Sequence, residues 1–268
     1  MRYKLTIEYD GTNLVGWQRQ DDGPSVQEYL ETALSFFRGA PQTFSDSHNN
    51  QLSYFTRYGK VPDIQFFCAG RTDAGVHATG QVAHFDIPET IDTFRIREAL
   101  NFHLRNNNIP VSVLSIETVD ENFHARFSAQ GRKYLYRIIN RRSPLILEKN
   151  RAWWVPVPLD VEKMRQAAQD LLGFHDFTSF RASACQAKSP LKTLDKLSIE
   201  THHDEIDFLV EARSFLHHQV RNMVGTLKMV GDGHFQVEDI HKILEAKDRK
   251  QAGPTAPAEG LYLTEVVY

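Results

Sequence analysis

The segment whose residues are best suited to carry out chemistry is 70–77, which reads GRTDAGVH. It sets one carboxylate, Asp73, between a cation, Arg71, and two glycines, Gly70 and Gly75. Glycine permits backbone angles, or a close approach of the backbone to a ligand, that a residue with a Cβ resists. A carboxylate presented in this way can serve as a nucleophile or as an acid–base group. The alternative is a hairpin whose polar side chains only bond their own backbone.

The patterns on either side of this segment indicate what holds it. An apolar run at 64–69 precedes it, and an alternating pattern at 82–85 follows. We therefore predict a loop between two strands, and loops on rigid scaffolds often carry catalytic groups.

A lone carboxylate also needs a partner that keeps it ionised, and Arg221 is the candidate. It lies beside the apolar stripe of a predicted helix at 217–230. A partly buried guanidinium is usually paired, and a neighbouring arginine favours the ionised form of a carboxylate. The alternative is a surface arginine at the start of the helix.

A basic and aromatic window indicates the class of ligand. Residues 126–151 contain eight basic residues against one acid, although the whole chain has a formal net charge of −3. The window also holds Phe127, Tyr134 and Tyr136. Cations for phosphates and rings for unstacked bases suit a single-stranded or flipped nucleotide. The alternative is a solvated basic strand whose aromatic side chains face the core.

Several familiar kinds of site have no motif in this sequence. It contains no phosphate-binding glycine loop, no H-E-x-x-H pair and no G-x-S-x-G elbow. The histidine pairs at 202–203 and 217–218 do not have ligand spacing across one helix face, and Cys68 and Cys185 form no C-x-x-C motif. We therefore expect no cofactor and no metal.

The chain as a whole has an ordinary globular composition. Its 268 residues are 41% hydrophobic and 24% charged, with no apolar run long enough to cross a membrane. The first residues do not form a signal region. We expect a cytoplasmic protein without membrane association.

Hydrophobic periodicity predicts the same order of elements twice. The first set is a strand at 3–9, a helix from 25, strands at 64–69 and 81–87, a helix at 94–104 and a strand at 111–119. The second set has strands at 132–140, 193–201, 206–213 and 261–267, with helices at 160–172, 217–230 and 238–246. This order predicts an α+β fold of two pseudo-duplicated split-βαβ halves of the ferredoxin/RRM-like type, 1–119 and 120–268, with mainly antiparallel sheets and a central cleft. A polar insertion at 38–63 interrupts the first half.

The motifs of the sequence resemble those of a known family, the bacterial tRNA pseudouridine synthase A (TruA) family. The resemblance runs almost from end to end, with motifs in the family's order, and the segment around Asp73 is the most specific of them. The matching stretches are 9–13 with 16–18, 70–78, 123–128, 133–136, 180–182 with 185–186, 215–216 with 220–221, and 252–258. The insertion at 38–63 is longer than the family's usual link.

The resemblance implies a role for four residues. It makes Asp73 the catalytic aspartate of an isomerase, and Arg221 the arginine paired with it. Tyr134 corresponds to the tyrosine that stacks on the target base, and Arg71 to the arginine that helps to displace the target nucleotide. It also implies the tRNA anticodon stem-loop as substrate at positions 38 to 40, a homodimer, and catalysis without cofactor or metal.

Two other functions compete with this expectation. A non-catalytic tRNA-binding protein on the same fold needs only the basic aromatic window, and it has no use for a carboxylate among phosphates. A carboxylate-dependent nucleoside hydrolase would release free base. The sequence does not decide whether Asp73 attacks C1′, attacks C6 or acts as a base.

Overall fold

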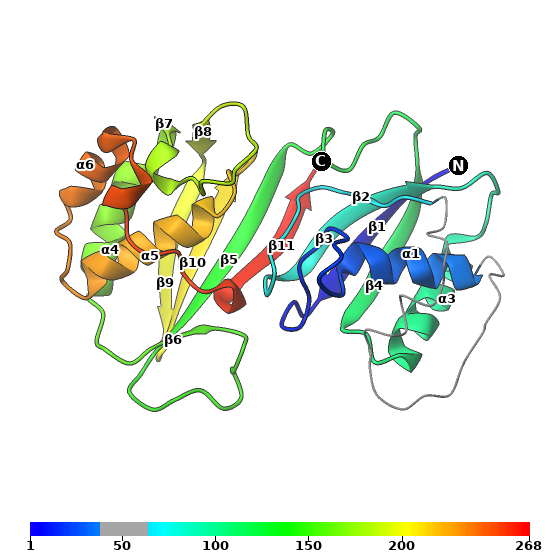
Figure 1. The fold of residues 1–268 in the computed structure, drawn as a ribbon, viewed down its shortest axis with the longest axis horizontal. Coiled ribbons are helices and arrows are strands. Elements are labelled where there is room, and N and C mark those ends of the chain that lie inside the picture. Colours follow the sequence, from blue (N-terminus) through cyan, green and yellow to red (C-terminus); the bar gives the residue numbers. More distant parts are fainter. Residues whose placement is uncertain (38–63) are drawn as a thin grey trace. The chain divides into compact units, whose positions relative to one another are not determined.

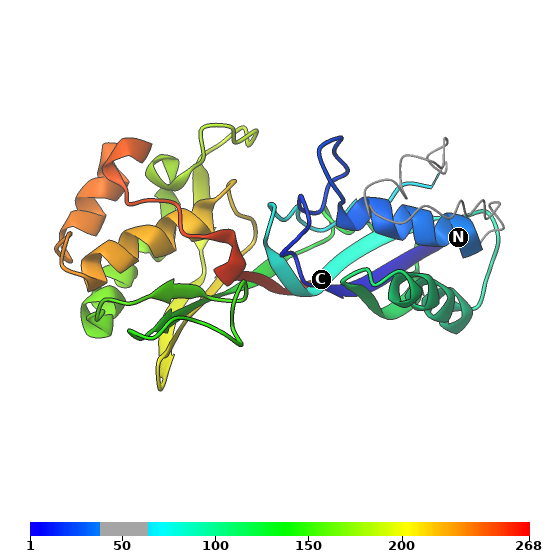
Figure 2. The same cartoon turned by 60° about the horizontal axis from the view of Figure 1, so that its bottom comes forward.

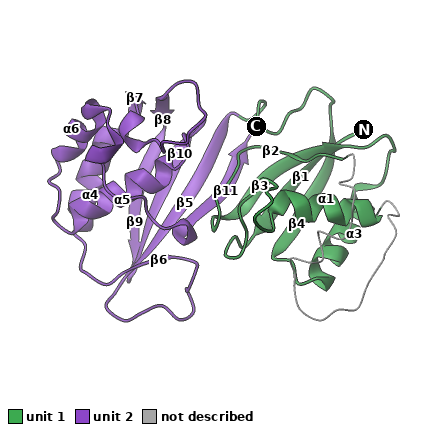
Figure 3. Ribbon diagram, in the orientation of Figure 1, with its two compact units in different colours: residues 1–129 green, residues 130–268 purple. Residues whose placement is uncertain are grey.

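The computed structural model describes residues 1–37 and 64–268, so the insertion predicted at 38–63 lies outside the described residues. The chain folds into two compact units, unit 1 (Met1–Ala129) and unit 2 (Gln130–Tyr268) (Figure 3). Sequence analysis places this division after residue 119.

Unit 1 is an open antiparallel sheet with helices on one face (Figure 1). Its strands have the order β4-β1-β3, and the short β2 pairs with β3. The elements are β1 (Arg2–Tyr9), α1 (Val26–Phe37), β2 (Phe67–Cys68), β3 (His77–Asp86), α3 (Thr93–Asn106) and β4 (Val111–Val119).

Alternation along β1 shows which face of this sheet the helices cover. Tyr3, Leu5 and Ile7 are fully buried, whereas the residues between them are partly exposed. Both helices begin at side-chain caps. The Ser25 hydroxyl accepts a hydrogen bond from the Glu28 amide at 3.3 Å, and Asp92 accepts one from the Arg95 amide at 3.0 Å.

In unit 2 the sheet has the strand order β11-β5-β10-β9, and helices α4, α5 and α6 lie on one of its faces (Figure 2). Pairing in this sheet is antiparallel except that β6 runs parallel to β5. The elements are β5 (Gly131–Asn140), β6 (Trp153–Val155), α4 (Val161–Ala168), β7 (Gly173–Asp176), β8 (Leu191–Leu194), β9 (Lys196–His202), β10 (Glu205–Ala212), α5 (Gln219–Gly231), α6 (Asp239–Ala246) and β11 (Leu261–Val267). None of the helices in the described ranges is long and apolar enough to cross a membrane.

The predicted combination of helices with mainly antiparallel sheets is confirmed, but one predicted strand is wrong. The stretch expected as a single strand at 193–201 is broken at Asp195, whose amide donates to the Glu211 carbonyl at 2.8 Å. The part before the break, β8, pairs with β7 in a separate two-stranded sheet. Leu194 and Leu197, on the two sides of the break, are three residues apart, so the alternation of a single strand does not run through it.

Helix α5 packs closely against the segment 252–257. A Cβ added at Gly225 would lie 1.8 Å from the Pro254 carbonyl oxygen, and one at Gly253 would lie 2.8 Å from Cα of Thr226. The Gly253 amide also donates to the Thr226 hydroxyl at 3.0 Å. The two segments therefore meet backbone to backbone, which only glycine allows.

We predict that Gly225→Ala lowers the free energy of unfolding by about 1–3 kcal/mol, because the new methyl group has no space. In a helix without such a contact, the same change would stabilise by up to about 1 kcal/mol. Urea denaturation measures the difference. Gly131→Ala is the control, since its Cβ would meet Val267 at an ordinary 3.6 Å. Equal stability of the two variants would contradict the backbone contact.

Candidate active site

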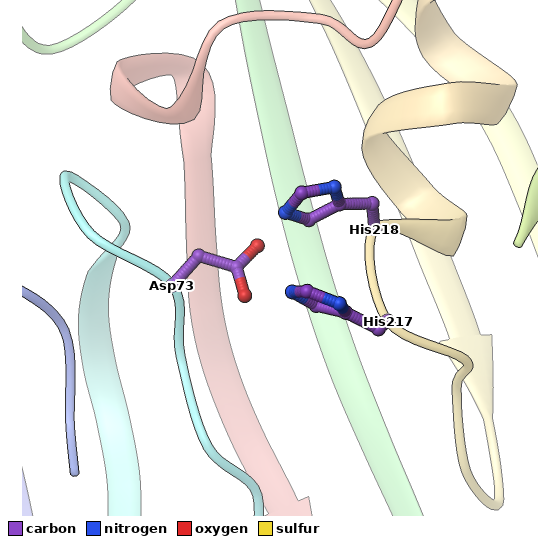
Figure 4. A group of neighbouring side chains, drawn as sticks. All are labelled: Asp73, His217 and His218. Carbon is purple, nitrogen blue, oxygen red and sulfur yellow. The ribbon is translucent and has the colours of Figure 1, made fainter. Parts of the chain in front are cut away.

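The predicted loop before β3 is present, and it carries Asp73. Its backbone is tied to the segment that follows β1: the Trp17 amide donates to the Thr72 carbonyl at 3.1 Å, and the Gly75 amide donates to the Leu14 carbonyl at 3.2 Å. Within the loop, the Val76 amide donates to the Asp73 carbonyl at 3.1 Å. Figure 4 shows the Asp73 carboxylate projecting from this loop. The arrangement presents the carboxylate on a fixed backbone.

Two glycines outside the loop allow this close contact. A Cβ added at Gly11 would lie 2.1 Å from the Val76 carbonyl oxygen, and one at Gly16, where φ is +107°, would lie 2.5 Å from the Thr72 carbonyl oxygen. Inside the loop, Gly75 has a positive φ of 78°, whereas Gly70 does not adopt this conformation. The backbone freedom predicted for the loop is therefore used at Gly75, and the closest backbone contacts fall at Gly11 and Gly16.

A buried polar network lies beneath the loop. The Tyr9 hydroxyl and the Thr72 hydroxyl are hydrogen-bonded at 2.7 Å. The Gln81 amide group donates to the Gly70 carbonyl at 2.8 Å and to the Tyr9 hydroxyl at 3.3 Å. Thr72 and Gln81 are buried, whereas Arg71 is exposed. Buried polar groups that have hydrogen-bond partners favour a single arrangement. The network therefore fixes the position of Thr72, the residue before Asp73.

The sequence alone does not indicate that Tyr9 and Gln81 belong to this network. Tyr9 stands in a stretch that carried the family resemblance, but nothing in its spacing shows that its hydroxyl reaches Thr72, which is far away in the chain. His77 is a second supporting residue of this kind. It is buried, and its Nδ1 accepts a hydrogen bond from the Gly11 amide at 3.0 Å.

Arg221 lies in the first turn of α5, in unit 2, and its side chain is held by the segment 252–257. Its Nε donates to the Ala256 carbonyl at 2.8 Å, and the Ala256 amide donates to the Arg221 carbonyl at 3.1 Å. Burial raises the pKa of Tyr136, and the Arg221 guanidinium opposes this rise, which places the cation near the Tyr136 ring. The Tyr136 hydroxyl donates to the Pro257 carbonyl at 2.8 Å. Arg221 is therefore a positioned, half-buried cation rather than a mobile surface residue.

Tyr134 lies on β5, opposite Val210 of β10 and Leu263 of β11. Its ring packs edge to face with Phe215 at a centroid distance of 5.1 Å. It is partly exposed, whereas Tyr136 on the same strand is fully buried. An aromatic side chain braced by a neighbouring ring can offer a stacking surface to a base.

Ion pairs within unit 2 change the interpretation of the basic window. Lys133 forms an ion pair with Glu265 at 2.8 Å, and Arg141 forms one with Asp204 at 2.9 Å. A third cation, Arg137, lies 3.0 Å from Glu148 and 2.6 Å from Glu205, and Arg132 is buried and donates to the Arg213 carbonyl. The acids come from other strands or from a turn outside β5. The local excess of positive charge along β5 is thus smaller than the sequence count indicates.

The neighbouring histidines 217 and 218 lie on the segment that leads into α5, as Figure 4 shows. Their ring centroids are 4.0 Å apart, and His218 has a positive φ of 61°. The His218 carbonyl accepts a hydrogen bond from the Asn222 amide at 2.8 Å, so this residue begins the helix that carries Arg221.

Comparison with known proteins places these features in a family context. Residues 5–128 and 167–268 match the family model described as tRNA pseudouridine synthase. The matched ranges include Arg71, Asp73 and Arg221, and Tyr134 lies between them.

Similar proteins cover the whole chain. The tRNA pseudouridine synthase A of Paramagnetospirillum magneticum is 56% identical over 267 residues, which are 100% of this chain and 95% of that protein. The proteins of the same name from Rhodospirillum centenum and Parvibaculum lavamentivorans are 52% and 49% identical, each over 100% of this chain and 99% of the relative.

We predict that the Tyr9 and Thr72 hydroxyls are energetically coupled. Tyr9→Phe should lower the free energy of unfolding by about 1–3 kcal/mol, because it leaves a buried hydroxyl and the Gln81 amide short of a partner. A double-mutant cycle with Thr72→Val, read by urea denaturation, should give a coupling energy of about 1 kcal/mol. Strictly additive effects would show that the hydrogen bond contributes nothing.

Proposed function

Because the chain belongs to the tRNA pseudouridine synthase family and isomerises uridine to pseudouridine in tRNA, we propose that Asp73 is the carboxylate that carries out this reaction. The observation that supports the assignment is the fixed loop: hydrogen bonds from Trp17 to Thr72 and from Gly75 to Leu14 hold the backbone on both sides of Asp73. Such rigidity suits a catalytic group, because a small error in the position of that group lowers the reaction rate strongly. A loop that only turned the chain would not need it.

The reaction needs a carboxylate but no external group. The bond between N1 of uracil and C1′ of ribose breaks, the base turns, and a bond forms between C5 and C1′. The proton on C5 is lost and N1 gains one, so atoms and electrons balance without an oxidant or a donor. Attack by Asp73 on C1′, attack on C6 and removal of a ribose proton are the three roles that fit this balance.

Three further residues are proposed to act with Asp73. Arg221 keeps the carboxylate ionised, since a guanidinium favours the charged form of a neighbouring acid. Tyr134 stacks on the target base once it has left the helix, and Arg71, exposed on the catalytic loop, helps to displace the nucleotide. Unstacking costs a few kcal/mol, of which stacking on an aromatic ring returns about 1–3 kcal/mol.

The finer features of the substrate and the assembly are proposed from the family resemblance. We expect modification at positions 38 to 40 of the tRNA anticodon arm, by a homodimer in the cytoplasm, without cofactor or metal. Each half of the molecule is proposed to be a split-βαβ unit of duplicated origin. The orders β4-β1-β3-β2 and β11-β5-β10-β9 support this, since each interleaves the strands in the same way.

We predict that Asp73→Asn and Asp73→Ala lower the rate of pseudouridine formation by at least about 1,000-fold, because the reacting carboxylate is lost. Tritium release from tRNA labelled at C5 of uridine measures the rate, and filter binding should show affinity within about threefold of the unaltered protein. Asp22→Asn, which changes an exposed aspartate of the same unit, should leave the rate unchanged. Activity in the Asp73 variants would rule out the assignment.

A second prediction concerns Arg221. Arg221→Lys keeps the charge but loses the Nε–H that donates to Ala256, so we expect the maximal rate to fall roughly 10- to 100-fold. The matched control is Arg165→Lys on α4, because the Arg165 Nε donates to the Ile199 carbonyl at 2.9 Å in the same kind of contact. If the rate falls by the same factor in both variants, Arg221 has only a structural role.

A further inference from the structure

A cluster of rings lies on the face of the unit 1 sheet that its helices leave uncovered. It consists of Phe67, His84, His124 and Phe127, which we call the aromatic strip. Centroid distances are 5.1 Å from Phe67 to His84, 4.7 Å from His84 to His124 and 4.4 Å from His124 to Phe127. The rings therefore form a continuous series rather than isolated contacts.

Strand register identifies the face. His84 of β3 stands opposite Lys4 of β1 and Phe67 of β2. Phe85, the next residue, stacks on Tyr3 in the core beneath the helices, so His84 points to the other face. The Ala125 amide donates to Nδ1 of His84 at 3.2 Å, which fastens the turn that carries His124 and Phe127 onto the sheet.

Both ends of the aromatic strip are exposed to solvent, the Phe127 end more than the Phe67 end. His84 is only 1% exposed, whereas the exposed fraction is 40% for Phe67 and 75% for Phe127. A ring that served only to cover the core would be buried. Phe127 instead stands at the more exposed end, supported by His124 beneath it. Exposed aromatic side chains held in place by neighbours are typical of binding surfaces.

The aromatic strip is uncharged at neutral pH. Burial lowers the pKa of His84 to about 4, with smaller effects from His124 and Arg2, and Asp86 only partly opposes this. Burial also lowers the pKa of His124, as do Arg2 and Arg126. The rings thus present neutral π faces, and the charge of this region is carried by the arginines around them.

These arginines connect the aromatic strip with the catalytic loop. The Arg126 guanidinium lies 5.9 Å from the centroid of Phe127. Burial raises the pKa of Cys68 to about 12, and Arg71 and Arg126 both oppose the rise, so both cations lie near this thiol. Arg71 adjoins Asp73 in the chain. Within unit 1, the cation near Asp73 in the chain and the cation beside the Phe127 ring therefore both lie near Cys68.

We propose that Phe127, His124 and Arg126 form a second nucleotide-binding site, in which the Phe127 ring stacks on an unpaired base of the substrate RNA and Arg126 contacts a neighbouring phosphate. The base is not the target uridine but another nucleotide of the same strand. This inference rests on the proposed role of the Asp73 loop. Neutral rings beside guanidinium groups suit RNA, because every base has a face to stack and every nucleotide carries a phosphate.

Substitutions of Phe127 separate stacking from simple hydrophobic contact. Phe127→Ala and Phe127→Leu should weaken binding of an unmodified tRNA transcript roughly 5- to 150-fold, whereas Phe127→Trp should bind within about twofold of the unaltered protein. Filter binding gives the affinity independently of any chemistry.

The matched control is Phe94→Ala. Phe94 is 60% exposed on α3, and the guanidinium of Arg97 lies 5.3 Å from its ring, so it repeats the same pair on the helical face of unit 1. Its removal should leave tRNA affinity within about twofold. Arg126→Ala should reduce the magnitude of the slope of log affinity against log salt by about one, which corresponds to the loss of one phosphate contact.

Three outcomes would overturn the proposal. The first is unchanged tRNA affinity in Phe127→Ala, and the second is equal affinity in the Leu and Trp variants. The third is a change in oligomeric state of Phe127→Ala in sedimentation, which would show that the aromatic strip binds a second copy of the chain. Failure of the proposed function has a different signature, since Asp73 variants would then keep their activity while the Phe127 series still altered binding.

Discussion

The close backbone contact between residues 11–17 and the loop 72–76 is the constraint on which the candidate site depends. Positions 11 and 16 have no space for a side chain, because carbonyl oxygens of the loop occupy it. A contact between backbones leaves few alternative arrangements, whereas long side chains could adapt. The end of β1 and the start of α1 are thereby coupled to the position of Asp73. The core of unit 1 therefore sets the position of this candidate catalytic carboxylate.

Unit 2 fixes its own candidate residue in a related way. The segment 252–257 approaches α5 at Gly225, and the same segment supplies the carbonyl that binds Nε of Arg221. Both candidate side chains therefore project from places where two backbones touch. The buried hydroxyl pair beneath the loop and the buried Tyr136 beneath the arginine satisfy the polar groups that such contacts enclose.

The elements that depend on local pattern could be predicted from the sequence. The alternation of β1, the stripe of α3 and the glycine-rich loop before β3 all follow from residues close together in the chain. The hydrogen bond that holds the break at Asp195 could not be predicted, because its acceptor, the Glu211 carbonyl, lies on another strand. The same reason applies to the charge of the basic window, where Glu205 and Glu265 come from strands that pair with β5 only after folding. The link between Tyr9 and Thr72 likewise exists only once β1 and β3 have paired.

The strand order within each unit has a consequence for folding during synthesis. Every strand of unit 1 lies within residues 1–129, so its sheet can close while later residues are still being made. In unit 2, β5 lies between β10 and β11, and β11 is the last strand of the unit to leave the ribosome. One edge of β5 therefore stays unpaired within unit 2 for most of the time that this unit is being translated. An exposed strand edge is a site for wrong pairing, so this delay leaves β5 open to aggregation while unit 2 is being made.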